Sequence, residues 1–349
     1  MWTREAGVHR GRRPPLPAYG APGPAARRGS ALLAVLWLSA ALAAIAFSLS
    51  NTVRAETDRA ATASEGLRSY YIAAGAVEDA AIRLLRFRED PRTQQGVLVG
   101  TVFHLEFPEG AADVEVIPEA SRLDINGERP ETLFRLLQAL GVDPERSREV
   151  ALAVLDWRTV RPPGVFSEFD SYYLSQVPSF HARHASFQEI EELLLVRGVT
   201  PDLFYGTYVP NPNAPAGQPR LVRRGGLADC VSVFGGGQPG IDVNTARPEV
   251  LEAIGLSPDL AAMVAERRRV GPITQAQLPE LMQQAGPAAP RLRVGGNTIY
   301  TLRATARLRL AGGQFSDLKR TVAAQVKYMP PGYDSPIHIL RWYDTAWSD

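Results

Sequence analysis

The sequence predicts an α+β protein, in which a long N-terminal helix is followed by an antiparallel sheet and a large all-α domain is inserted between the strands. Three observations lead to this fold class. An uncharged apolar stretch runs into an amphipathic stretch without a proline, strand patterns occur early and near the C-terminal end, and helical patterns fill the interval between them. A chain of 349 residues has room for two or three such parts.

The helix begins at the apolar stretch 30–49. These residues carry no charge, and at 1.5 Å per residue they span about 30 Å, the hydrocarbon thickness of a bilayer. Arginines precede the stretch at positions 12, 13, 27 and 28, and such charges hold a chain end in the cytoplasm. We therefore expect residues 1–29 in the cytoplasm, 30–49 in the membrane, and the rest of the chain on the far side.

The helical pattern continues through residues 50–90, which contain no proline. Apolar residues recur there at steps of three and four, as one face of a helix requires; they are Leu67, Tyr70, Tyr71, Ala74, Val77, Ala81, Leu84 and Leu85. Asp90-Pro91 ends the pattern, because the residue before a proline disfavours helical angles. We predict one helix from about residue 30 to about residue 88, with its second half packed on a globular head.

Three interpretations fit the N-terminal region. It is a secretory signal cleaved at Ala44-Ile45-Ala46, an uncleaved anchor, or a leader cut between Gly29 and Ser30 directly before the apolar stretch. The amphipathic continuation favours the third, because a cleaved secretory signal has no reason to run into a stalk helix.

Strand patterns stand on both sides of the helical region. Residues 99–107 and 112–118 are rich in β-branched and aromatic residues, and residues 300–310 alternate strictly between apolar and polar. Gly312-Gly313 then predicts a turn, with a returning strand at 318–328 and a further one at 337–343. The polar side of the first of these strands carries Arg303, Arg307 and Arg309, which we interpret as a solvated face with edge protection and not as a nucleic-acid strip.

Helical patterns occupy the middle of the chain, at 130–140, 144–158, 186–198, 248–255, 257–269 and 274–286. Residues 210–226 are rich in Pro, Gly and Asn, and they predict a loop. We assign residues 91–122 and 297–349 to a β head, and residues 123–296 to an inserted α-helical domain.

Two stretches of this insert, 123–133 and 241–251, share the pattern [L/I]-D-[I/V]-N-x-x-R-P-E-x-L. Pro130 and Pro248 suit the first position of a helix, while Asn126 and Asn244 can brace the preceding turn through bonds from side chain to backbone. Asp124 and Asp242 recur with the repeat, so we interpret them as turn-closing residues and not as paired catalytic carboxylates. Each copy then predicts a leading strand followed by a helix–turn–helix hairpin.

These hairpins are similar to helix-hairpin-helix (SAM-like) modules, many of which bind DNA. The DNA-binding members carry a glycine-rich turn of the form G-[I/V]-G, whose N–H groups approach a phosphate. The turns here, at 141–144 and 255–258, lack the second glycine, and the formal net charge is only +1. We expect a structural or protein-contact role and no nucleic acid; the alternative is a membrane-anchored DNA receptor or a minor pilin of DNA uptake.

The N-terminal region resembles the type IV pilin and pseudopilin superfamily, through its basic residues, Gly29, and an apolar helix that leads into an amphipathic one. The resemblance implies that prepilin peptidase cuts after Gly29 and methylates the new N-terminus at Ser30. Most members carry a Glu as fifth residue of the mature chain, where this chain has Ala34. Because that Glu is thought to pair with the subunit ahead, its absence implies a position at the tip.

Further segments resemble the minor pseudopilin K family of type II secretion systems: 123–126, 152–158, 187–201, 241–251 and the last strand with Trp342. The resemblance implies a non-enzymatic tip subunit of the pseudopilus that serves protein export across the outer membrane. It also implies an inner-membrane anchor with the bulk of the chain in the periplasm. The implied partners are the minor pseudopilins I and J, other pseudopilins and prepilin peptidase.

Members of that family can bind calcium in the helical domain, although no cofactor is certain for this chain. The residues that remain as ligand candidates are Glu168 and Asp170, and the alternative is a pair of solvated loop charges. His181 and His184 have no cysteine or acidic residue close by in the sequence, so we expect them in a surface loop. The single Cys230 cannot form an intrachain disulfide, and the chain shows no nucleophile elbow, P-loop or dinucleotide glycine motif. We therefore expect no enzymatic activity.

Overall fold

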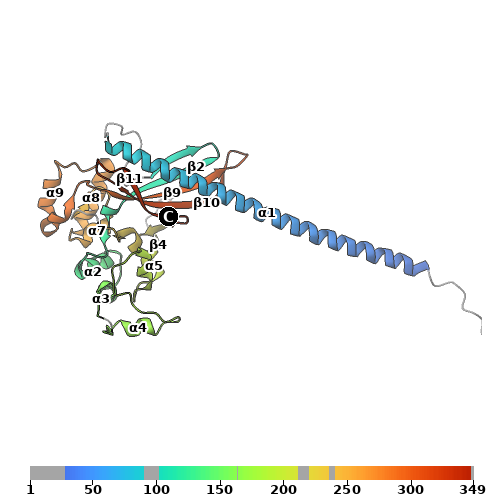
Figure 1. Cartoon of the computed structure of the whole chain (residues 1–349), viewed down its shortest axis with the longest axis horizontal. Helices are drawn as coiled ribbons and strands as arrows, with labels where there is room; N and C mark the ends of the chain where they lie inside the picture. Colours follow the sequence, from blue (N-terminus) through green and yellow to red (C-terminus); the bar gives the residue numbers. More distant parts are fainter. Residues whose placement is uncertain (1–27, 90–101, 163, 211–219, 236–239, 347–349) are drawn as a thin grey trace, which may run out of the picture. The chain divides into compact units, whose positions relative to one another are not determined.

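The computed structural model describes residues 28–89, 102–162, 164–210, 220–235 and 240–346. The chain divides into two units, Met1–Ala63 and Ser64–Asp349. Helix α1 (Arg28–Glu89) contributes to both, and the second unit holds the sheets and the remaining described helices (Figure 1). A long N-terminal helix and an antiparallel sheet in an α+β chain confirm the predicted fold class.

In the first unit α1 leaves its apolar side chains exposed. Leu32 is 77% exposed, Trp37 75% and Phe47 71%. The most apolar window of 18 residues has a mean hydropathy of 2.4, and none of it is buried. One helix of this kind near the N-terminus fits a single-pass membrane anchor, and a signal sequence would satisfy the same criteria.

In the second unit, the rest of α1 lies on one face of the sheet through a stripe of small residues. Ala73, Ala76 and Ala80 are fully buried, while Leu67 is 57% exposed and Tyr71 66% exposed. The predicted face is confirmed for Val77, Ala81 and Leu84, which are buried, and it was wrong for Leu67 and Tyr71. The alanines are buried because the facing strands also present many small residues. The helix can therefore approach the sheet closely only through its own small side chains.

The main sheet has the strand order β1-β2-β9-β10-β11, with every neighbouring pair antiparallel. The strands are β1 (Val102–Phe107), β2 (Gly110–Pro118), β9 (Ile299–Arg309), β10 (Phe315–Tyr328) and β11 (Ile337–Tyr343). Alternate residues of β9 are buried against α1, as the strict alternation predicted. The whole insert lies in sequence between β2 and β9, which are hydrogen-bonded neighbours.

Two arginines on the other face of the sheet are paired with carboxylates of the neighbouring strand β2 and of the edge strand β1. Arg303 bonds to Glu115 on β2, and Arg309 bonds to Glu106 on β1 at 2.6 Å. These cross-strand pairs neutralise two of the three arginines in the row. The row is thus paired with carboxylates, but β9 is the central strand of the sheet, so the expected edge protection was wrong.

His104 on β1 lies between two carboxylates, and this arrangement predicts a pH response. Its Nδ1 is 2.9 Å from Asp113 Oδ1, and its Nε2 is 3.0 Å from Glu106 Oε1. The hydrogen bonds to Asp113 and then to Glu106 raise the pKa of His104. The resulting stabilisation is present below the unfolded pKa of about 6.5 and is lost as pH rises through the folded pKa. In an NMR titration the imidazole midpoint should lie above about 6.5, and Asp113→Asn should lower it; a wild-type midpoint at or below that value would contradict the assignment.

The insert consists of short helices and three two-stranded bridges. The helix η2 (Glu119–Ser121) precedes it, and its own helices are α2 (Pro130–Ala139), α3 (Pro144–Arg158), α4 (Asp170–Leu174), η3 (Ile190–Leu195), α5 (Pro201–Tyr205), α6 (Leu227–Cys230), α7 (Pro248–Ala253), α8 (Pro258–Val270), α9 (Leu278–Ala285) and η4 (Gly286–Arg291). β3 (Leu123–Asp124) pairs in parallel with β6 (Val231–Ser232), and β7 (Ile241–Asp242) with β8 (Leu292–Arg293). β4 (Thr207–Pro210) and β5 (Leu221–Arg224) form an antiparallel ribbon.

Two expectations for the insert were wrong. Residues 186–198 form only the short 3₁₀ helix η3, because Phe187 is held by a distant side chain and Gly198 has a φ of 84°. The expected loop 210–226 contains the last residue of strand β4 and the whole of strand β5, while its residues 211–219 lie outside the described part of the chain.

Candidate functional site: the two modules of the inserted domain

The repeated stretches form two similar modules. In each, a two-residue strand (β3 or β7) leads through a turn into a helix that begins at Pro130 or Pro248. The residue before each proline is an arginine with extended backbone and no side-chain cap. A second helix, α3 or α8, follows after a short turn, so the predicted leading strand and helix hairpin are both present.

The repeated aspartates close the turn that precedes each first helix. The backbone N–H of Asn126 donates to Asp124 Oδ1 at 2.9 Å, and that of Asn244 donates to Asp242 Oδ1 at 3.1 Å. Such bonds two residues along the chain are typical of Asx turns. The prediction that Asp124 and Asp242 are turn-closing residues is confirmed.

The repeated asparagines hold a distant segment instead of the local turn. The Asn126 side chain accepts from Phe187 N–H at 2.7 Å and donates to the Phe187 carbonyl at 3.0 Å. In the second module, Asn244 makes the same pair of bonds with Ile273, at 2.7 and 2.9 Å. The expectation of a local brace was wrong for the asparagine side chains, because the aspartates already serve the turn.

One arginine that the sequence analysis missed completes each module. Arg158, the last residue of α3, donates to the carbonyls of Ile125 and Glu128. Arg268 in the last turn of α8 donates to the equivalent carbonyls of Val243 and Ala246. We call this arrangement the carbonyl clamp. Burial lowers the pKa of both guanidinium groups, and a basic residue in the last turn of each second helix was the signal in the sequence.

In the turn between the two helices of each module, the glycine N–H group donates a hydrogen bond to the preceding helix. Gly141 has a φ of 80° and Gly255 a φ of 114°, a region that favours glycine. Gly141 N–H donates to the Gln138 carbonyl at 2.8 Å, and Gly255 N–H donates to the Glu252 carbonyl at 2.9 Å. The N–H groups that would face a phosphate in a DNA-binding hairpin therefore already have partners in the preceding helix.

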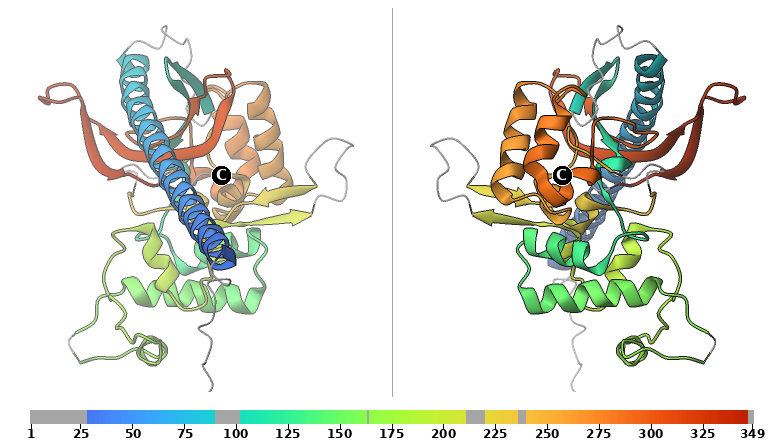
Figure 2. Two further views of the ribbon diagram at one scale, coloured as in Figure 1. Left: turned by 90° about the vertical axis from the view of Figure 1, so that its right-hand side faces the viewer. Right: turned by 90° about the vertical axis from the view of Figure 1, so that its left-hand side faces the viewer.

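The two modules pack on each other and share one hydrophobic core. Helix α2 contacts α7, and Arg135 Nε on α2 donates to the Ala253 carbonyl at the end of α7 at 2.8 Å. Leu133 and Leu251, at equivalent positions of the repeat, are both buried in that core. Figure 2 shows the first module in green beside the second in orange.

The calcium candidates lie in the segment between α3 and η3. Asp170 is buried, and its Oδ1 is 3.1 Å from His184 Nε2 while its Oδ2 accepts from Ser167 N–H at 2.6 Å; Glu168 is exposed. Burial disfavours the ionised form of Asp170, but the bonds from Ser167 and His184 outweigh it and lower the pKa of the carboxyl group. The neighbouring Asp156 bonds to Arg161 and Ser167 at 2.6 and 2.8 Å.

These carboxylates do not fit a calcium site. Calcium takes six to eight oxygen ligands, whereas His184 and Arg161 present nitrogen donors to Asp170 and Asp156. Within the described ranges, no group of three or more His, Cys, Asp or Glu side chains is arranged to hold a metal ion. His184 was expected on the surface, but only 17% of its side chain is exposed, so that expectation was wrong.

The candidate processing residues Gly29, Ser30 and Ala34 all lie within α1. Ser30 and Ala34 are exposed. The structure brings Asn126 together with Pro130 in one module and Asn244 with Pro248 in the other, and the calcium candidates belong to neither turn.

Comparisons with known proteins agree with this architecture. Residues 118–206 match the family model of type II secretion system (T2SS) protein K. A solved structure, the GspK-GspI-GspJ complex from the enterotoxigenic Escherichia coli Type 2 Secretion System, contains a chain with the same fold at a TM-score of 0.56 and 16% identity. The similarity covers 83% of this chain and 100% of that chain. No curated protein matches this sequence. Residues 118–206 are therefore similar to protein K of type II secretion systems, and the chain shares its fold with a chain of the GspK-GspI-GspJ complex.

Proposed function

We propose that this protein is a minor pseudopilin at the tip of a type II secretion pseudopilus, where it acts as an assembly subunit for protein export across the outer membrane. The observation that carries the proposal is the protein K domain at residues 118–206, inserted between β2 and β9 of a sheet that packs on a long N-terminal helix. The related solved chain is part of a complex with GspI and GspJ. By analogy, the partners of this chain are minor pseudopilins I and J.

The N-terminal residues support the tip position. Ala34 stands at the fifth position after the Gly29–Ser30 junction, where most pilin-like subunits carry a glutamate. Without that carboxylate, the subunit has no group to pair with the amine of a subunit ahead of it. An inserted domain on the head is also compatible with a subunit that has no further subunit stacked on it. In this proposal the chain is anchored in the inner membrane, and its bulk lies in the periplasm.

N-terminal sequencing of the protein extracted from membranes tests this proposal. The mature chain should begin at Ser30, N-methylated, and Gly29→Ala should reduce processing, because prepilin peptidase requires the glycine in the family that this region resembles. A mature chain that begins at Met1 or at Phe47 would contradict the proposal.

An enzymatic role has no support, since the relatives found are structural subunits. The competing function is DNA capture by the two helix hairpins. The turn N–H groups of Gly141 and Gly255 bond within their helices, which disfavours phosphate binding. A salt-dependent gel shift with duplex DNA would be needed to revive the DNA receptor, and we expect none.

We also propose that the segment around α4 is held without calcium. Arg161 already pairs with Asp156, and a ring nitrogen of His184 lies against Asp170, so a calcium ion would have to displace both partners. A ligand stabilises a fold only as far as it binds the folded state. The melting temperature of the detergent-solubilised chain should therefore differ by less than about 2 °C between excess calcium and EDTA, since 1 kcal/mol corresponds to roughly 2–4 °C at this size. A calcium-dependent rise beyond that range would restore the calcium site.

A further inference from the structure

A groove of about 430 Å³ lies between α2 and α3 on the surface of the first module. Its apolar lining consists of Pro130, Phe134, Ala151 and Leu152, and its charged lining consists of Glu131, Arg135 and Arg148. Leu152 is 42% exposed, while Phe134 is half-buried and packs partly against the shared core. Two large apolar side chains thus face solvent in one concave place.

Because the module occurs twice in the chain, the second module can be compared with the first at the position of this groove. The first helices can be aligned at Pro130 and Pro248, and the second helices at the clamp residues Arg158 and Arg268. The second alignment pairs Ala151 with Ala261 and Val154 with Val264; Ala151 is 2% exposed, Val154 3%, and their counterparts are fully buried. The shared burial shows that the clamp aligns the two modules in space as well as in sequence.

At the groove itself the modules differ. Phe134 and Glu252 are each the fifth residue of the first helix, and Leu152 and Ala262 each lie six positions before the clamp arginine. The second module therefore folds with a glutamate and an alanine where the first carries a phenylalanine and a leucine. Because the module fold does not require these two large side chains, they are available for another protein.

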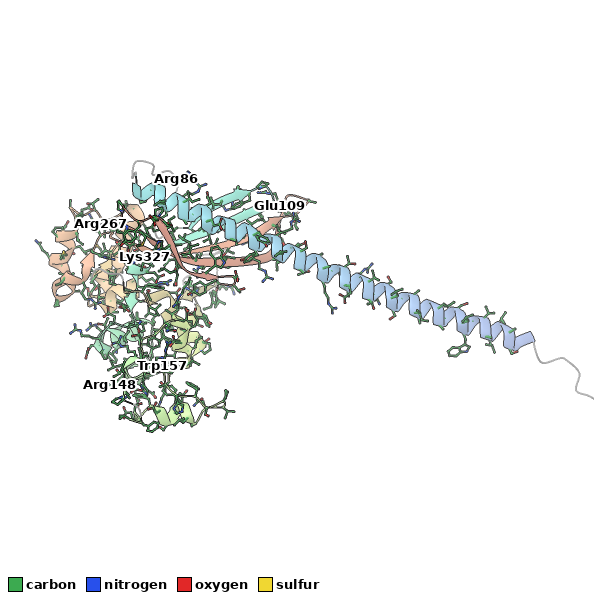
Figure 3. All side chains as sticks on the ribbon, in the orientation of Figure 1. Arg86, Glu109, Arg148, Trp157, Arg267 and Lys327 are labelled. Carbon is green, nitrogen blue, oxygen red and sulfur yellow. The ribbon has the colours of Figure 1, made fainter. Side chains whose placement is uncertain are left out.

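The charges around the groove indicate the chemistry of that protein. Arg135 uses its Nε for the Ala253 carbonyl, and in the described part of the chain neither Arg148 nor Glu131 has an ion pair. Figure 3 shows Arg148 at the margin of the insert. Two guanidinium groups against one carboxylate leave a net positive rim, which complements carboxylates on a partner.

We propose that this groove is a docking site for one of the partner subunits of the pseudopilus tip, which inserts an apolar side chain flanked by carboxylates. An apolar anchor in a pocket with arginines at its margin is the usual composition of an energetically dominant contact. This inference rests on the proposed function, because it takes the partner from the tip complex.

The test uses the full chain in detergent and I-type and J-type subunits from the same organism, with dissociation constants measured by microscale thermophoresis. The groove variants are Phe134→Glu, Leu152→Ala and Arg148→Glu, of which the first two introduce the residues of the second module. The matched controls are Glu252→Gln, Ala262→Ser and Arg267→Glu in the second module. Each groove variant should raise the Kd for one of the two subunits at least about tenfold, and each control should change it less than about twofold.

The outcomes separate the two proposals. If the unaltered chain binds neither subunit, the proposed function fails and the inference fails with it. If the unaltered chain binds and the groove variants bind equally well, only the inference fails. Should Phe134→Glu lose its folded circular dichroism spectrum, Leu152→Ala and Arg148→Glu decide the question, because both substitutions are at the surface.

Discussion

Replacing Arg158 by methionine is expected to lower the free energy of unfolding of the first module by about 2–4 kcal/mol. The guanidinium group donates to the carbonyls of Ile125 and Glu128, and bonds from a charged donor contribute about 1.5–3 kcal/mol each, with the lower values for part-exposed groups. Methionine keeps the length of the side chain but leaves both carbonyls without this donor. Arg268→Met should have the same effect on the second module, where Arg268 donates to Val243 and Ala246.

Hydrogen–deuterium exchange locates each effect. In Arg158→Met, amide exchange should accelerate about 30-fold to 1,000-fold in residues 123–158 and much less in 241–268, and Arg268→Met should show the reverse. Arg148→Met and Arg267→Met are controls on the same two helices, for which we expect changes within about 0.5 kcal/mol. Equal exchange in clamp variants and controls would show that the clamp contributes nothing.

Trp157→Ala is expected to cost about 3–5 kcal/mol. Trp157 is 3% exposed, stacks on Phe187 with ring centroids 6.2 Å apart, and meets Tyr173 edge to face at 5.4 Å. Phe187 is also the residue that Asn126 holds through its backbone. Loss of the indole therefore removes the surface on which the segment after α4 rests, and urea unfolding should show a lower midpoint.

Trp157→Phe separates packing from hydrogen bonding at this site. The indole N–H of Trp157 has no hydrogen-bond partner in the described part of the chain, and a buried donor without a partner costs about 1–3 kcal/mol. Phenylalanine removes that donor together with part of the ring, so its net cost should stay below about 1.5 kcal/mol. A cost equal to that of Trp157→Ala would mean that the indole N–H is satisfied in solution.

Local patterns were enough to predict the long helix, the β9–β10 hairpin and the paired helices. Each follows from periodicity or from a start and stop signal within a few residues, such as Pro130 or Gly312-Gly313. The same local pattern correctly placed Val77 and Leu84 on the buried face of α1, but it included the exposed Tyr71 and missed Ala76. The size of the buried side chains is decided by the strands that face them, and these strands are distant in the sequence.

The contacts that build the two modules join residues far apart in the sequence, so local patterns could not predict them. Asn126 bonds to a residue 61 positions away, and His184 bonds to Asp170 across 14 positions. The clamp arginines lie at different spacings from the repeat, because α2 is longer than α7 and because Arg158 lies further along α3 than Arg268 does along α8. A search for residues at the fixed repeat offset therefore finds the asparagines and prolines but not Arg158 and Arg268.

The central claim is that this protein assembles with minor pseudopilins. The most direct test is co-purification of the affinity-tagged full chain, extracted in mild detergent, with I-type and J-type subunits from the same organism. The claim predicts a complex that contains both subunits, remains intact through size exclusion, and carries this protein with Ser30 as its N-terminus. Elution of the tagged chain alone, or with Met1 as its N-terminus, would contradict it.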